Sequence, residues 1–186
     1  MQSYGRALVC LALLLTALSG PAPVRGQQDQ LAIIVVDFQS VVRNSDAAQS
    51  IHEQIDGLRQ GYQEEFGQLE EELRALETEL TEERASLSAE QFARRRRSFE
   101  QRVTDAQREA QARRAALDEA LNAAMSQVRT TLVEVIADIA RTHEADLVLS
   151  RSQVVLVDSA LEFSDEALAE LNARLPNVIV QTPGVE

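Results

Sequence analysis

The residues that could carry chemistry in this chain are few and widely spaced. The two histidines are His52 and His143, and neither has a second histidine or a cysteine at the spacing of a metal site. Glu144 and Asp146 lie close to His143 in sequence, but a polar helix C-terminus explains these three residues better than a metal site does. The sequence contains no GxSxG, no P-loop and no GxGxxG. We therefore predict that the protein is not an enzyme and uses no metal or cofactor.

The first unusual pattern is a run of four consecutive arginines. Its members are Arg94, Arg95, Arg96 and Arg97. Four successive positions cover the whole circumference of a helix, so at least one of these side chains lies near the apolar face. One interpretation is a solvated charge run that is balanced by Glu90 and Glu100. The other is a basic surface that contacts anionic lipid head groups or acidic segments of another polypeptide.

The second unusual pattern is a group of three glycines in a stretch that otherwise favours helix. They are Gly57, Gly61 and Gly67. Each glycine inside a helix costs up to about 1 kcal/mol relative to alanine, so the group needs a reason. One reason is close packing of two helices through small residues. The other is a flexible point, a hinge at which the helix bends.

Composition and charge exclude some classes of function. The chain has 186 residues and a formal net charge of −12, with 30 acidic and 18 basic residues. A general nucleic-acid binder needs a basic surface, so we expect no nucleic-acid partner. Aromatic residues make up 4% of the chain and tryptophan is absent, so we expect no large aromatic core.

The first 26 residues have the features of an export signal. A charged start at Arg6 precedes an apolar run of twelve residues, 7–18, which is too short to span a bilayer. Small and turn residues follow up to a predicted cleavage site after Gly26. The only cysteine, Cys10, lies inside the apolar run, so the mature chain carries no thiol. We predict an exported, soluble protein.

A very long helical stretch occupies residues 46–143. It contains no proline and is rich in Glu, Arg, Ala, Leu and Gln. The apolar residues of its first half follow heptad steps with one four-residue stutter: Ile51, Ile55, Leu58, Tyr62, Phe66, Leu69, Leu73, Leu76 and Leu80. Those of its second half are Phe92, Phe99, Val103, Ala106, Ala110, Leu117, Leu121, Ala124, Val128, Leu132, Val135 and Ile139. The middle of this second seam is poor, because Ala106 and Ala110 bury little area and Arg113 takes the next seam position.

The long stretch is predicted to fold back on itself as an antiparallel hairpin. Ser88 and Gln91 fit a capping box, so a second helix begins there and the tip lies near Leu87 and Ser88. The helices would have about 40 and about 55 residues, near 60 and 80 Å from the rise per residue. The alternative, one continuous rod, would separate the strands that we predict at the two ends of the stretch.

Those strands flank the helical stretch. The β-branched run at residues 31–36 predicts one buried strand, followed by one or two helical turns at 38–43. Residues 146–149 and 154–157 predict two short strands, and the polar link between them favours an antiparallel β-hairpin. A short helix then begins at Ser164 and ends near Leu175, before Pro176.

These elements predict an α+β fold that is mostly α. Residues 27–45 and 144–186 form a small β-containing body, and residues 46–143 form a long antiparallel helical hairpin, a coiled-coil tentacle, that extends from it. Three short strands cannot bury both of their faces, and two slender helices have little core. We therefore expect a homo-oligomer whose strands complete one sheet or barrel.

The order and spacing of several segments resemble the OmpH/Skp family of periplasmic chaperones. They are IIVVDFQSVV at 33–42 after a signal, IADIA at 136–140 leading into DLVL at 146–149, and VVLVD at 154–158 followed by SDEALAELN at 164–172. The resemblance covers essentially residues 31–175. The best-known members are strongly basic, whereas this chain is acidic. We therefore assign no lipid-binding residues from the resemblance. Arg94 to Arg97 are our own choice for a surface that contacts lipid.

The resemblance implies a periplasmic homotrimer with a central barrel-like body and three helical tentacles that enclose a cavity. It implies an ATP-independent holdase that binds unfolded outer-membrane proteins after export and prevents their aggregation. An anionic membrane surface or lipopolysaccharide would be a further partner. The alternative function is a structural coiled-coil scaffold of the envelope that binds one folded partner and has a filled seam.

Overall fold

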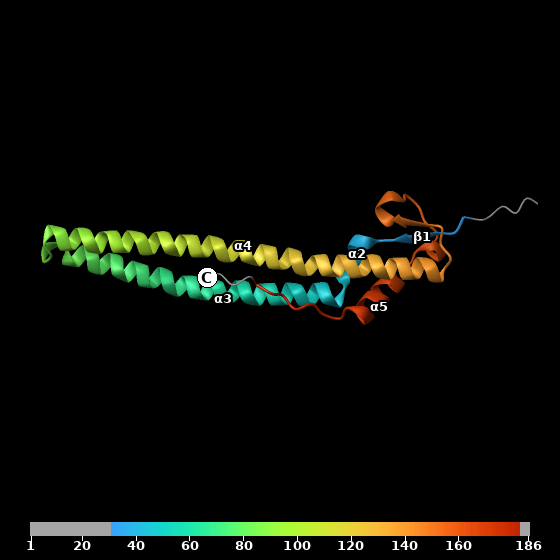
Figure 1. The fold of residues 1–186 in the computed structure, drawn as a ribbon, viewed down its shortest axis with the longest axis horizontal. Helices are drawn as coiled ribbons and strands as arrows, with labels where there is room; N and C mark the ends of the chain where they lie inside the picture. The colour runs from blue at the N-terminus through green and yellow to red at the C-terminus, as the bar shows by residue number, and fades with distance from the viewer. Residues whose placement is uncertain (1–30, 183–186) are drawn as a thin grey trace, which may run out of the picture. The chain divides into compact units, whose positions relative to one another are not determined.

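Two long helices account for most of the fold. The computed structural model describes residues 31–182, and the predicted signal at residues 1–26 lies outside this range. Helix α3, Asp46–Glu82, packs against helix α4, Ala89–Thr142, and Figure 1 shows the two running side by side. They have 37 and 54 residues, close to the predicted lengths. The hairpin is confirmed and the continuous rod is wrong.

The tip of the hairpin is closed by the predicted capping box. A short 3₁₀ helix, η1 (Glu83–Ala85), ends α3, and the chain reverses over residues 86–88. The Ser88 hydroxyl accepts a hydrogen bond from the Gln91 backbone N–H, and the Gln91 side chain accepts one from the Ser88 N–H. Two backbone donors that α4 would otherwise leave free are thereby satisfied, which fixes where this helix begins.

Strand β1, Ile33–Val36, is the centre of the body. It pairs in parallel with strand β2, Leu147–Ser150, in a register that aligns Ile33 with Leu147. On its other side, the Val35 carbonyl accepts a hydrogen bond of 2.9 Å from the Phe163 backbone N–H. The prediction that the two ends of the helical stretch meet in one sheet is therefore confirmed.

The predicted antiparallel β-hairpin between residues 146–149 and 154–157 is wrong. The polar link forms a 3₁₀ helix, η2 (Arg151–Gln153), in which the Arg151 guanidinium donates to the Val154 carbonyl at 2.6 Å. This helical turn carries the chain away from β2 and does not reverse it. Residues 154–157 form no strand, and Val155 and Leu156 are 90% and 88% exposed. A third 3₁₀ helix, η3 (Ser159–Leu161), leads back towards β1.

Two shorter helices join the sheet to the hairpin. Helix α2, Phe38–Asn44, follows β1 and is capped by the Asp37 carboxylate, which accepts from the Ser40 N–H at 2.9 Å. Helix α5, Ser164–Arg174, confirms the predicted C-terminal helix and packs against α2 and α4. None of the helices within residues 31–182 has both the length and the apolar composition that a bilayer-crossing segment needs.

The buried core is confined to the body and the adjoining part of the hairpin. Its largest fully buried side chains include Ile51 of α3, Leu132 and Val135 of α4, and Leu171 of α5. Between residues 56 and 115, by contrast, every residue of the hairpin is half-buried or exposed. The outer part of the hairpin therefore depends on a thin line of contacts, and its free energy of local opening should be lower than that of the core.

Candidate functional site

The outer hairpin carries a continuous line of half-buried apolar side chains. We call it the outer seam, and its residues are Tyr62, Phe66, Leu69, Leu73, Leu76, Leu80, Phe99, Val103, Ala106 and Ala110. All of these positions were predicted from the heptad pattern, and each contributes only part of its surface to the contact between α3 and α4. Apolar surface that two helices leave uncovered is available to a third partner.

The outer seam opens into a groove of about 760 Å³ at its inner end. Tyr62, Phe66 and Leu73 of α3 line one side, and Ala106 and Ala110 of α4 line the other. Alanine side chains are too short to fill the space opposite an aromatic ring or a leucine, which is why the groove exists. A smaller groove of about 290 Å³ lies nearer the tip, between Leu76, Leu80 and Phe99.

Arg113 occupies the seam position at the inner end of the large groove. Its guanidinium carbon lies 4.8 Å from the centre of the Tyr62 ring and 5.6 Å from that of Phe66, within the range of a cation–π contact. The same group donates to Glu109 at 2.6 Å and to Glu65 of the opposite helix. Its side chain is only 23% exposed. An arginine thus takes the place of a seam leucine without leaving its charge unpaired.

The pKa of Arg113 reports the same balance of forces. Burial disfavours the charged form of the guanidinium. Hydrogen bonds and the negative charges of Glu109 and Glu65 outweigh that cost and raise the pKa above its usual value. Arg113 therefore keeps its charge, which Glu65 and Glu109 balance at the inner end of the groove.

The four arginines of the tip are exposed, and three of them are paired with glutamates. Arg94 contacts Glu90 at 2.5 Å, and Arg96 contacts Glu100 at 3.3 Å, both within α4. Glu90 and Glu100 are the two partners that the charge-balanced interpretation names, and the contact surface stays a prediction. Such exposed pairs contribute little stability and open readily in water.

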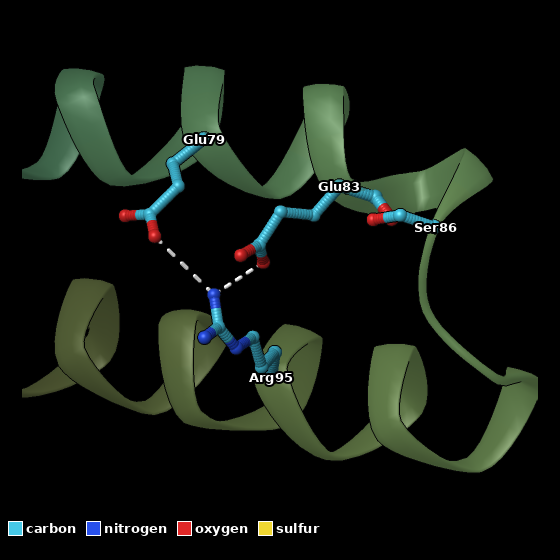
Figure 2. Close-up of polar contacts among 4 residues, drawn as sticks. All are labelled: Glu79, Glu83, Ser86 and Arg95. Carbon is cyan, nitrogen blue, oxygen red and sulfur yellow. Dashed lines mark hydrogen bonds and ion pairs between the residues drawn. The ribbon is translucent and has the colours of Figure 1, made fainter.

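Arg95 differs from its neighbours because it reaches across the hairpin. Figure 2 shows its guanidinium between Glu79, at 3.3 Å, and Glu83, both on the opposite side of the tip. It is the member of the run that lies beside the seam. Arg97 has no ion-pair partner among residues 31–182, and neither has Glu82, so the charge of Arg97 is locally free although the tip carries no net positive charge.

The three glycines have open space beside them, and Gly67 lines the large groove. A Cβ atom added at Gly57, Gly61 or Gly67 would meet no neighbouring atom within 4 Å. The interpretation that they let α3 pack closely against another helix is therefore wrong within residues 31–182, where no side chain or backbone lies against them. Helix α3 runs through all three without a break. The hinge interpretation stays a prediction.

His143 lies at the junction of α4 and α5. Within residues 31–182, no group of three histidine, cysteine, aspartate or glutamate side chains could hold a metal ion. His143 ends α4, packs against Phe163 with ring centres 4.4 Å apart and ring planes tilted by 55°, and places Nε2 3.2 Å from a carboxylate oxygen of Glu166. It joins the end of α4 to the start of α5, as expected for a polar helix terminus.

Two features of the hairpin could not be found from sequence patterns alone. The first is the stacking of Arg113 on two aromatic rings, although its place in the seam and the glutamate four residues earlier were visible signals. The second is a contact between Gln54 of α3 and the segment after Pro176, which pairs residues 124 apart in the sequence. No periodicity or motif marks either member of that pair.

A long antiparallel helical hairpin with a half-exposed apolar seam, joined to a small parallel sheet, defines a class of coiled-coil hairpin proteins. A family model described as outer membrane protein (OmpH-like) matches residues 32–171. The chain belongs to this OmpH-like family.

A solved structure supports the same fold. It is that of a candidate outer membrane chaperone (OmpH-like) from Caulobacter crescentus CB15, and it superposes with a TM-score of 0.78 at 17% sequence identity. The superposition covers 90% of this chain and 95% of that one. The comparison with curated proteins gave no match.

Proposed function

We propose that this chain is an ATP-independent holdase chaperone of the periplasm. It would bind unfolded outer-membrane proteins after export and keep them from aggregating. The observation that carries the proposal is the outer seam, a line of apolar side chains that the two helices leave half-covered. Membership of the OmpH-like family supports a chaperone role and gives no support to an enzymatic one.

The seam suits weak, distributed binding of an unfolded chain. Fully burying one large apolar side chain stabilises a complex by about 1.5–3 kcal/mol, and a half-buried side chain has only part of this left to give. Several such contacts along the hairpin hold a client without any single deep pocket. Each contact also breaks readily, so release requires no nucleotide hydrolysis.

The charges of the hairpin support the same role. Glu70, Glu71 and Glu72 are exposed on α3, and the chain carries a net charge of −12. An acidic surface discourages self-association of the chaperone. The tip arginines, with Arg97 unpaired within the described chain, would contact an anionic membrane surface or lipopolysaccharide.

The body offers a surface on which copies of the chain could assemble into a homotrimer. Val155, Leu156 and Leu161 are exposed, as are Leu147 and Val148 of β2. Within residues 31–182 the outer edge of β2 pairs with no other strand. Exposed apolar side chains beside an unpaired strand edge favour association with another chain. Three tentacles would then surround a shared space for the client.

A structural scaffold of the envelope is the alternative function. A rod-like spacer would be expected to fill its seam, because unfilled space costs stability. The groove of about 760 Å³ between Tyr62 and Ala110 favours the chaperone over this alternative.

An aggregation assay tests the proposal. A urea-unfolded outer-membrane β-barrel protein is diluted into buffer with and without the mature chain, and light scattering is recorded without ATP. We expect the chain to suppress scattering in proportion to its trimer concentration. Suppression that needs ATP, or no suppression at all, would contradict the proposal. Bovine serum albumin at equal mass is the control for nonspecific protection.

A further inference from the structure

The chain covers part of its own helix α3 with the segment that follows α5. We call residues 176–182 the strap. Figure 1 shows it running beside α3 after α5 ends. Val178 of the strap is 4% exposed and belongs to the same buried cluster as Ile51 and Ile55 of α3, whereas its neighbour Ile179 is 74% exposed.

Gln54 of α3 binds the strap through its backbone. Its side-chain Nε2 donates to the Val178 carbonyl at 2.8 Å, and its Oε1 accepts from the Val180 N–H at 3.0 Å. One amide side chain thus makes the pair of hydrogen bonds that a neighbouring β-strand would make to residues i and i+2. The Ser50 carbonyl and hydroxyl, each 3.2 Å from Nε2, help to hold the amide in place.

These contacts do not depend on the sequence of the strap. The Gln54 amide binds only main-chain groups, which every extended polypeptide offers at the same spacing. Side chains contribute at alternate positions: Val178 is buried and Val180 packs partly buried against the same core cluster, whereas Ile179 between them is exposed. An extended segment of another polypeptide with apolar side chains at residues i and i+2 would satisfy the same groups.

The strap site also leads into the rest of the seam. Leu58 and Tyr62 follow Ile51 and Ile55 at helical spacing on α3, and both pack partly buried against the same core cluster. Tyr62 in turn lines the large groove. A chain bound beside Gln54 could therefore continue along α3 into that groove without crossing a polar gap.

We propose that the surface around Gln54 is a binding site for extended, apolar segments of unfolded polypeptide, and that the strap occupies it when no client is bound. The inference rests on the proposed chaperone function and names one of its binding sites. The strap then acts as a built-in competitor. A client segment displaces it by supplying its own backbone to Gln54 and its own side chain to the position of Val178.

The opposing interpretation is that the strap only stabilises the base of the hairpin. The two interpretations predict different effects for a weakened strap. A competitor that is weakened makes the site more available, so a peptide from outside binds more tightly. A purely structural segment that is weakened lowers the stability of the fold and leaves peptide binding unchanged or poorer.

The test uses a fluorescent peptide with the strap sequence Pro-Asn-Val-Ile-Val-Gln-Thr and the full-length chain. Its affinity is measured by fluorescence anisotropy for the wild type, for Val178→Ser and for Ile179→Ser. The second variant makes a similar change at an exposed neighbour and is the matched control. We expect Val178→Ser to bind the peptide about tenfold more tightly than the wild type, as loss of one buried valine contact in the strap implies. Ile179→Ser should bind it like the wild type.

Adding Gln54→Ala to Val178→Ser should remove that gain, because the peptide loses both backbone hydrogen bonds. Equal affinity of Val178→Ser and the wild type, or a gain that survives Gln54→Ala, would overturn the proposal. If Val178→Ser does not fold, hydrogen exchange of the wild-type protein tests whether the peptide displaces the strap. Saturating peptide should speed exchange of the Val180 amide if it displaces the strap, and unchanged exchange would count against displacement.

The aggregation assay separates failure of this inference from failure of the proposed function. Suppression of aggregation without peptide binding at Gln54 leaves the chaperone function standing and removes only this site. Peptide binding at Gln54 without suppression of aggregation would leave a peptide-binding site on a protein that is not a holdase.

Discussion

The Arg113 guanidinium lies over the ring of Tyr62, with its central carbon 4.8 Å from the ring centre. An arginine on one helix and an aromatic residue on the other thus close the inner end of the outer seam. Glu65 and Glu109 hold the charge in place. Because the charge is satisfied, the seam can tolerate a cation where a coiled coil normally places a leucine. Beside Arg113, the short side chains of Ala106 and Ala110 leave the large groove open.

Arg113→Leu should therefore stabilise the hairpin and impair client binding. A leucine restores the heptad pattern, and Glu65 and Glu109, which lose their partner, are 60% and 44% exposed, so water can solvate their charges. We therefore expect a net gain of about 1 kcal/mol. Without the guanidinium, we expect the Tyr62 and Phe66 rings to pack against the leucine in the helix contact, which leaves less apolar surface open to a client. We expect a higher midpoint in urea unfolding and weaker suppression of aggregation. Arg108→Leu, the same change at an exposed position on α4, is the control and should leave both unchanged. A destabilised Arg113→Leu variant would contradict this account of the groove.

Asp138 should make the junction of α4 and α5 sensitive to acid. Hydrogen bonding to Arg174, with a further contribution from the charge of Arg141, lowers the pKa of Asp138 below its usual 3.8. A carboxyl whose pKa is lower in the folded state stabilises that state at pH values above its unfolded pKa. This stabilisation is lost as the pH falls from about 3.8 towards the folded pKa.

Asp138→Asn should accordingly melt at a lower temperature than the wild type at neutral pH, and the difference should shrink in acid. Thermal melts followed by circular dichroism, at neutral pH and below the unfolded pKa, measure both values. Asp105→Asn, an exposed aspartate of the same helix paired only with Arg108, is the matched control. A difference that stays constant across the pH range would show that the charge of Asp138 plays no part.

Replacing Gly57, Gly61 and Gly67 together with alanine should stabilise α3. No atom lies within 4 Å of the new methyl groups, so each substitution gains helix propensity without a clash. The sum is up to about 3 kcal/mol in the free energy of unfolding, measured by urea titration. If the glycines form a hinge, the stiffer arm should also hold a narrower range of client sizes. Equal capture of large and small clients would contradict the hinge interpretation, whereas the predicted gain in stability would be unaffected.

Neutralising the tip should weaken contact with anionic membranes. Changing all four tip arginines, 94–97, to glutamine should reduce binding to phosphatidylglycerol vesicles at low salt, measured by co-sedimentation. The double variant Glu90→Gln, Glu100→Gln makes the opposite change. It removes the acidic partners of Arg94 and Arg96 and should strengthen binding to the vesicles. Vesicle binding that responds to neither change would show that the arginines are only a solvated charge run.

Local sequence signals predicted the hairpin well. The Ser88 and Gln91 pair marked the start of α4, and the heptad steps identified the outer seam, because both signals involve residues a few positions apart. The pattern of β-branched residues also found β1 and β2. It failed at residues 154–157, where an equally apolar run is exposed and forms no strand. An apolar run indicates that a segment tends to be buried. The structure of a single chain does not show which surface would cover it.

Contacts between distant residues could not be predicted in this way. Gln54 and Val178 are brought together by the fold of the whole base of the hairpin, and a lone glutamine on a polar helix face carries no signal. The function of the glycines was equally hidden, since small residues suit both close packing and flexibility. The open space around Gly57, Gly61 and Gly67 removed one of these choices.

The measurement that tests the central claim most directly is native mass spectrometry of the mature chain. It is recorded for the chain alone and after a urea-unfolded outer-membrane barrel protein has been diluted into it. The account predicts a homotrimer that gains the mass of one client without nucleotide. An oligomer that does not bind the unfolded client would contradict the chaperone function and favour the structural scaffold. A monomer would contradict the proposed homotrimer.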